Sequence, residues 1–82
     1  MHYIYSIKSQ FNVRIYIGQT KGIKERIVAH NKGRVKSTKS HRPWKLFALQ
    51  KVDSRPKATW IEKKLKKSHG TRLEWLSKNR LE

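Results

Sequence analysis

The 82-residue chain contains no cysteine, which excludes disulfide bridges and cysteine-ligated zinc sites and fits a reducing compartment. It also contains no apolar run near the roughly 20 residues that a transmembrane helix needs. The first residues, MHYIYSIK, have neither the basic leader nor the long apolar stretch of a secretion signal. We therefore expect a cytoplasmic protein that does not insert into a membrane.

Acidic residues are scarce as well. Five Asp and Glu stand against 21 Lys and Arg, which gives a formal net charge of +16. Such an excess lowers stability through self-repulsion, and a polyanionic partner offsets it. The basic residues are spread along the whole chain rather than along one helix face, so nucleic acid is favoured over a membrane surface. The length predicts a single domain, residues 1–82, with an open site that suits a polymeric substrate.

The first half of the chain has the pattern of a hairpin followed by a helix. Residues 2–8 and 13–19 alternate apolar and polar side chains as strands do, and the turn-forming residues 9–12 separate them. From 22–31 the apolar residues recur at helical spacing, and Gly33 is a suitable helix end. These features predict a β-hairpin and a first helix.

The second half predicts a further strand and two helices. Residues 34–43 are basic and nearly free of apolar side chains, which indicates an exposed loop, and 44–52 has the composition of a mostly buried strand. Ser54 is a suitable N-cap for a second helix that ends before Gly70, and a Thr-x-x-Glu capping box opens a third helix over 71–78. The expected fold is α+β, a three-stranded, mainly antiparallel sheet flanked by three helices in the order ββαβαα.

Two tripeptides in the predicted hairpin carry the functional signal. They are YIY at 3–5 and YIG at 16–18, and they precede further polar residues on the predicted helices. The residues of interest are, in chain order, Tyr5, Tyr16, Gly18, Arg26, His30 and Glu62. In this order and spacing the chain resembles the GIY-YIG nuclease superfamily over nearly its whole length, and it is most similar to small stand-alone bacterial members. Tyr3 stands where the family name has glycine.

The resemblance implies a metal-dependent endonuclease that hydrolyses phosphodiester bonds. It implies that Glu62 binds Mg²⁺ or Mn²⁺, that Tyr16 is the general base and that Tyr5 positions water or phosphate. A single carboxylate suits Mg²⁺, which keeps several waters and often takes only one or two protein ligands. The alternative for Glu62 is a solvent-facing ion pair with Lys66 at i,i+4, which is worth ~0.2–0.5 kcal/mol.

Arg26 and His30 lie four residues apart and therefore share one face of the first helix. Arginine can bridge two phosphate oxygens, and His30 can orient water or share a proton with a tyrosine. The alternative is a basic helix face whose C-terminal histidine carries partial positive charge. A tyrosine with a pKa near 10 becomes a useful base only where a cation such as Arg26 or His30 lowers that pKa. Otherwise Tyr5 and Tyr16 are strand aromatics that pack the sheet.

Further residues are candidates for contact with the substrate. Gly18 allows close approach of the backbone, or else is a turn glycine that leads into the helix. We expect phosphate contacts from the basic loop, at Lys36, Lys39, His41 and Arg42. Of the tryptophans Trp44, Trp60 and Trp75, at least two should pack in the core rather than stack on bases. Asn79 stays outside the predicted site because it lies near a terminus that can fray.

Two alternatives to an autonomous nuclease remain. A non-catalytic nucleic-acid-binding protein would explain the +16 charge equally well, because phosphate binding does not depend on sequence. A nuclease module that takes its specificity from a protein partner would fit the small size. Single-stranded, duplex and branched DNA and RNA all suit an open basic cleft, and DNA is the favoured substrate.

Overall fold

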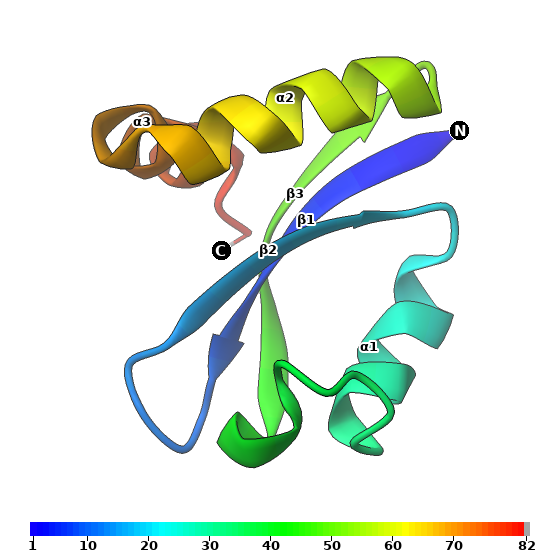
Figure 1. The fold of residues 1–82 in the computed structure, drawn as a ribbon, viewed down its shortest axis with the longest axis vertical. Coiled ribbons are helices and arrows are strands. Elements are labelled where there is room, and N and C mark those ends of the chain that lie inside the picture. The colour runs from blue at the N-terminus through cyan, green and yellow to red at the C-terminus, as the bar shows by residue number, and fades with distance from the viewer. Residues whose placement is uncertain (82) are drawn as a thin grey trace.

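The computed structural model describes residues 1–81 and has the predicted order of elements (Figure 1). The elements are β1 (His2–Ser9), β2 (Ile15–Thr20), α1 (Ile23–Asn31), the short 3-10 helix η1 (Lys39–His41), β3 (Trp44–Val52), α2 (Arg55–Lys67) and α3 (His69–Asn79). The α+β fold and the order ββαβαα are thus confirmed, with η1 as an addition inside the predicted loop.

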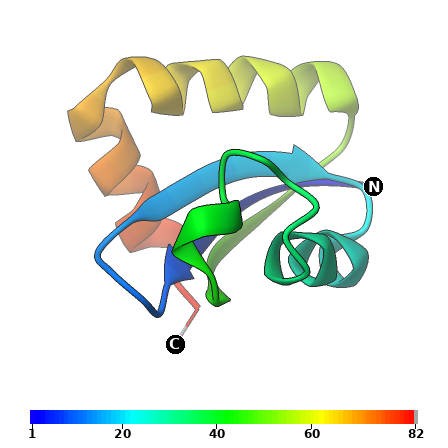
Figure 2. The ribbon, with the colours of Figure 1, turned by 60° about the horizontal axis from the view of Figure 1, so that its bottom comes forward.

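The sheet has the strand order β2-β1-β3, and both pairs are antiparallel. The helices lie on both sides of it: α2 and α3 cover one face and α1 covers the other (Figure 2). The larger core lies under α2 and α3 and is formed by Ile4, Ile17, Ala48, Val52, Ala58, Leu65, Trp75 and Leu76. On the α1 face, Tyr5, Ile7 and Trp44 form a second buried cluster. Burial of Trp44 and Trp75, with Trp60 60% exposed, confirms that two of the three tryptophans pack in the core.

The pairing of β1 with β3 contains a bulge. Ser6 lies opposite Ala48, but the next residue, Ile7, lies opposite Leu46. Phe47 is therefore an extra residue with no partner on β1. Bulges bend a strand and redirect a side chain, and Phe47 packs against the core on the α2 and α3 side.

The hairpin turn is longer than predicted, because β2 begins at Ile15 rather than at Val13. In this turn, side-chain oxygens accept backbone N–H groups that would otherwise pair between the two strands. The Ser9 hydroxyl accepts the backbone N–H of Asn12, at 3.0 Å, and the side-chain oxygen Oδ1 of Asn12 accepts that of Arg14, also at 3.0 Å. Val13 consequently points to solvent.

The helix ends confirm most of the predicted signals and correct one. Ser54 caps α2, and Gly33 adopts a φ of 77° just after α1. The third helix, however, begins at His69, where the Ser68 hydroxyl accepts the N–H of Thr71, so the predicted capping box at Thr71 is wrong. Ser68 ends α2 and caps α3 at once, which leaves no loop between the two helices. No helix in the described part of the chain is both long and apolar enough to cross a bilayer.

Candidate functional site

Four of the five predicted catalytic residues lie together on the α1 face of the sheet. Tyr5 and Tyr16 project from neighbouring strands, with ring centroids 6.3 Å apart. The His30 ring stands edge-on to both, at 5.8 Å from Tyr5 and 5.2 Å from Tyr16. Arg26, one turn earlier on α1, donates from Nε to the Tyr5 hydroxyl oxygen at 3.2 Å.

These residues form a chain of hydrogen bonds whose direction can be deduced from its inner end. The Val35 carbonyl can only accept, so the Thr38 hydroxyl donates to it, at 3.3 Å. Thr38 Oγ1 therefore accepts from His30 Nδ1–H, at 2.8 Å. His30 Nε2 is then unprotonated and accepts the Tyr5 O–H, at 2.8 Å. Together with the bond from Arg26 to Tyr5, every polar group in the chain has a partner.

Burial sets the protonation states of this network. Desolvation, reinforced by the positive charge of Arg26, lowers the pKa of His30 to about 4. Desolvation also raises the pKa of Tyr5 to about 12, because it outweighs the hydrogen bond and charge of Arg26 that lower it. Arg26 thus lowers the pKa of Tyr5 as expected, but burial has the larger effect, so Tyr5 is not made a better base. His30 is a neutral side chain at neutral pH rather than a cation.

Arg26 connects the buried network to solvent. Its hydrogen bond to Tyr5 is the largest cause of its raised pKa, and Tyr16 contributes in the same direction. Tyr5 is fully buried, whereas Arg26 and Tyr16 are half-buried. Arg26 also lines an open depression that begins at Thr20. A substrate can therefore reach Arg26 and Tyr16 but not the Tyr5 hydroxyl.

Glu62, the fifth predicted catalytic residue, lies on α2 and is tied to the β2 edge of the sheet. Its side chain is only 17% exposed, so the solvent-facing alternative is wrong, although the i,i+4 ion pair with Lys66 is present at 2.7 Å. Lys66 Nζ in turn lies 5.8 Å from the centroid of the Tyr16 ring. The negative charge of Glu62 is also a minor contribution to the raised pKa of Tyr5. Glu62 thus belongs to the surroundings of the two tyrosines.

Gln19 holds Glu62 in place, and no residue pattern selected it in advance. Gln19 Nε2 donates to Glu62 Oε1 at 2.9 Å and to the Thr59 hydroxyl at 3.0 Å. Its carbonyl oxygen accepts from Nε2 of the buried His2, at 2.8 Å, which fixes the orientation of the amide. The available signal was its position in the sequence. Gln19 comes directly after the YIG tripeptide, and its side chain points to the opposite face of the strand from Gly18.

Gly18 lies in the middle of β2, so the alternative of a turn glycine is wrong. The close approach is to the two tyrosines. A Cβ on Gly18 would stand 2.8 Å from the Tyr5 hydroxyl oxygen and 3.0 Å from Cε2 of Tyr16. Glycine is needed here because the tyrosine side chains fill the space above it.

The basic loop contributes a buried residue as well as surface charge. Thr38 is 1% exposed, which the polar composition of the loop did not indicate. The exposed side chains include Lys36, Lys39 and Arg42. His41 is half-buried instead, and its Nδ1 accepts from the Asn12 amide at 2.9 Å, which holds the loop against the hairpin turn.

The residues at this site are compatible with one hard divalent cation. Residues 1–81 contain no group of three or more His, Asp and Glu side chains that could hold a metal ion. Glu62 stays the predicted ligand. Gln19 and Lys66 use two of about four lone-pair directions of the carboxylate, and Mg²⁺ completes its coordination with water and phosphate oxygens. Asn79 does not join the site, because its amide donates to the Trp75 carbonyl at 2.9 Å.

Comparison with known protein families agrees with this geometry. A family model for the GIY-YIG catalytic domain matches residues 1–75, a span that holds both tyrosines, Arg26, His30 and Glu62. Comparison with curated proteins and with solved structures gives no match. The match covers most of the chain. The chain therefore belongs to the GIY-YIG family of endonuclease-type hydrolases, which act on nucleic acid.

Proposed function

We propose that this protein is a metal-dependent endonuclease that hydrolyses phosphodiester bonds of DNA, with one Mg²⁺ or Mn²⁺ on Glu62. The observation that carries the proposal is the solvent-accessible pair Arg26 and Tyr16, backed by the buried Tyr5–His30 network in a chain of the GIY-YIG family. The substrate phosphate approaches Arg26 and Tyr16 from the side on which these half-buried residues are exposed to solvent.

Arg26 binds the scissile phosphate in this proposal. Its Nε is committed to Tyr5, so the two terminal nitrogens remain for phosphate oxygens. The guanidinium is pre-oriented, because Tyr5 is itself anchored by His30. A fixed cation facing the phosphate stabilises the charge that builds up on its oxygens in the transition state.

Tyr16 is the general base, as the family implies. As the phenolate, Tyr16 takes a proton from a water whose oxygen attacks phosphorus. The bond from phosphorus to the leaving oxygen breaks with its electron pair, and the leaving oxygen takes a proton from solvent. Tyr5 is unsuited to this task because its pKa is raised to about 12. The Lys66 ammonium, 5.8 Å from the centroid of the Tyr16 ring, is a cation beside this residue.

Glu62 is the ligand that would hold the divalent cation. When bound, the cation supplies positive charge near the leaving oxygen and the phosphate. Gln19 keeps Oε1 of Glu62 oriented, and the exposed Lys66 is the donor that a cation on Glu62 would displace. The neighbouring lysines then remain available to phosphates.

A cleavage assay with a matched pair of variants tests the proposal. Labelled single-stranded DNA, duplex DNA, a branched junction and RNA are incubated with Mg²⁺ or Mn²⁺, with EDTA as the control. Glu62→Gln is compared with Glu74→Gln, which removes an exposed carboxylate that also faces a lysine at i,i+4. We expect metal-dependent cutting of DNA by the wild type and Glu74→Gln, reduced at least about 100-fold in Glu62→Gln. Equal cutting by both variants would refute the assignment of Glu62.

The net charge of +16 supports a second candidate, a basic protein that binds nucleic acid without cutting it. The same assay separates the two candidates, because a protein that only binds nucleic acid would leave all four substrates uncut. A module that requires a protein partner for specificity would cut slowly and without preference among DNA sequences.

A further inference from the structure

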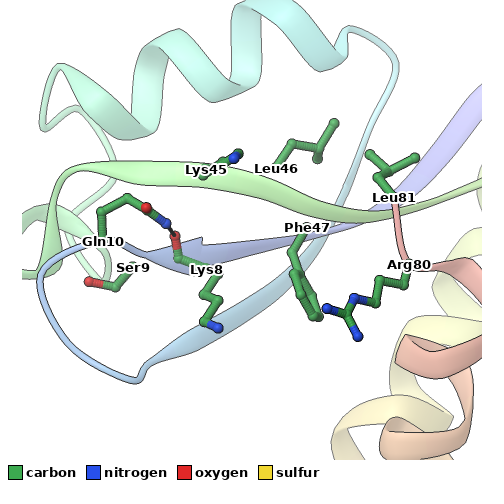
Figure 3. Close-up of a pocket in the computed structure, with 8 residues that line it drawn as sticks. All are labelled: Lys8, Ser9, Gln10, Lys45, Leu46, Phe47, Arg80 and Leu81. Atoms are coloured by element: carbon green, nitrogen blue, oxygen red, sulfur yellow. Dashed lines mark hydrogen bonds between the residues drawn. The ribbon is translucent and has the colours of Figure 1, made fainter.

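A second concave surface lies away from the candidate active site, where the C-terminal segment meets the end of the sheet. It is a cavity of about 420 Å³ lined by Lys8, Ser9, Gln10, Lys45, Leu46, Phe47, Arg80 and Leu81 (Figure 3). Three of these side chains are cationic. None is acidic, and residues 1–81 supply no ion pair to any of the three cations.

Two of the cations converge on one aromatic ring. Lys8 Nζ lies 5.6 Å and the Arg80 guanidinium carbon 5.5 Å from the centroid of the Phe47 ring, and Figure 3 shows them on either side of it. Two like charges at one ring repel each other, and the ring attracts each only weakly at an exposed site. Anions bound to these cations would relieve this repulsion.

The backbone holds this arrangement in place. Phe47 is the extra residue of the β3 bulge, and the bulge turns its side chain toward Lys8 rather than into a pair with β1. The C-terminal segment is attached to the same strand: Arg80 bridges to Ala48, and the Leu81 N–H donates to the Phe47 carbonyl at 2.9 Å. Arg80 is therefore presented by an ordered segment.

The lining determines the chemical class of the ligand. The cations suit phosphate, but the Phe47 ring, which lies on the same face as Lys8 and Arg80, would stay uncovered by a phosphate alone. A base of a duplex is stacked and paired and cannot reach this ring, whereas an unpaired base can lie against an aromatic side chain. The combination matches single-stranded nucleic acid.

We propose that the pocket of Lys8, Phe47 and Arg80 binds a single-stranded segment of nucleic acid outside the scissile bond, with its phosphates on the cations and an unpaired base against the Phe47 ring. Lys8 alternates with Ile7, which belongs to the α1 face, so the pocket opens on the α2 and α3 face, away from the tyrosines. The inference rests on the proposed function only in taking nucleic acid as the partner. It makes the preferred substrate one with a single-stranded tail or branch.

Binding measured in EDTA tests the pocket separately from cleavage. Fluorescence anisotropy is recorded with labelled oligo-dT, with a hairpin duplex of equal phosphate number, and with that duplex carrying a single-stranded tail. Lys8→Gln/Arg80→Gln is compared with Lys57→Gln/Lys78→Gln, which removes the same charge from exposed positions on α2 and α3. Thermal melting by circular dichroism verifies the fold, and Phe47→Leu serves as a second pocket variant.

We expect the pocket pair to weaken binding of oligo-dT and the tailed duplex about tenfold or more, and the control pair less than about threefold. Phe47→Leu should weaken the same two ligands about fivefold or more while leaving the plain duplex unchanged. Equal losses from the pocket and control pairs on all three ligands would overturn the proposal, because net charge alone would then explain binding. Displacement of oligo-dT by millimolar inorganic phosphate would overturn the base contact and leave an anion site. These outcomes hold whether or not the protein cuts DNA.

Discussion

Replacing Thr38 with valine tests the buried network most directly. Valine has nearly the shape of threonine but cannot accept the hydrogen bond from His30 Nδ1, which is 2.8 Å long in a site where both residues are at most 1% exposed. A buried donor without a partner costs about 1–3 kcal/mol. At about 4–8 °C of Tm per kcal/mol for a chain of this size, a cost of ~2 kcal/mol lowers Tm by about 8–16 °C.

A double-mutant cycle separates this cost from loss of packing. In the His30→Leu background Thr38→Val no longer leaves a histidine N–H unpaired, so it should cost less than about 0.5 kcal/mol. Urea unfolding followed by tryptophan fluorescence measures all four proteins, since the indole N–H of Trp44 donates to the Thr38 carbonyl at 2.8 Å and reports locally. Ser37→Ala, next to Thr38 but exposed, is the control. The same cost for Thr38→Val in both backgrounds would refute the hydrogen bond between Thr38 and His30.

Three further predictions concern other parts of the site. The pKa of His30 is about 4 in the folded chain against 6.5 when unfolded, so the unfolded chain binds more protons between these values. The free energy of unfolding should therefore fall by roughly 3 kcal/mol as pH drops from 6.5 to 4, and urea unfolding of His30→Gln should show a flatter pH profile. Gly18→Ala should destabilise the fold by about 1–3 kcal/mol and reduce cleavage, because its Cβ meets the Tyr5 oxygen at 2.8 Å; unfolding and cleavage assays that match wild type would contradict this. Gln19→Leu should raise the metal concentration needed for half-maximal cleavage about 10- to 100-fold, because it frees the Glu62 carboxylate to rotate. Saturating metal should restore the rate. An unchanged metal titration would exclude this positioning effect.

The fold was predictable because its signals are local. Strand alternation, the Ser54 cap and Gly33 each depend on a few neighbouring residues, and all are present as expected. The errors arose where two signals competed. Ser68 and Thr71 are both suitable caps, and the chain uses the earlier one because it lies directly at the end of α2.

The site was predictable only in part. Tyr5, Tyr16, Arg26 and His30 are brought together by one hairpin and one adjacent helix, so their spacing in sequence carries their geometry. Thr38 reaches His30 through the fold of a basic loop that reads as exposed, and no residue type marks it. The protonation states were also beyond the sequence, because desolvation depends on burial and not on which charges are near in the chain.

The position of β1 in the middle of the sheet has a consequence for synthesis of the chain. Its pairing with β2 needs only the first 20 residues, but its other edge stays without hydrogen-bond partners until residues 44–52 have been made. During that interval the edge of an apolar strand is exposed, and such edges favour association with other chains. Glu62 follows later still, on α2. A nascent chain therefore holds its tyrosines, Arg26 and His30 well before it holds Glu62. If Glu62 is the metal ligand, as proposed, the chain becomes competent to cut only after this strand edge has been paired.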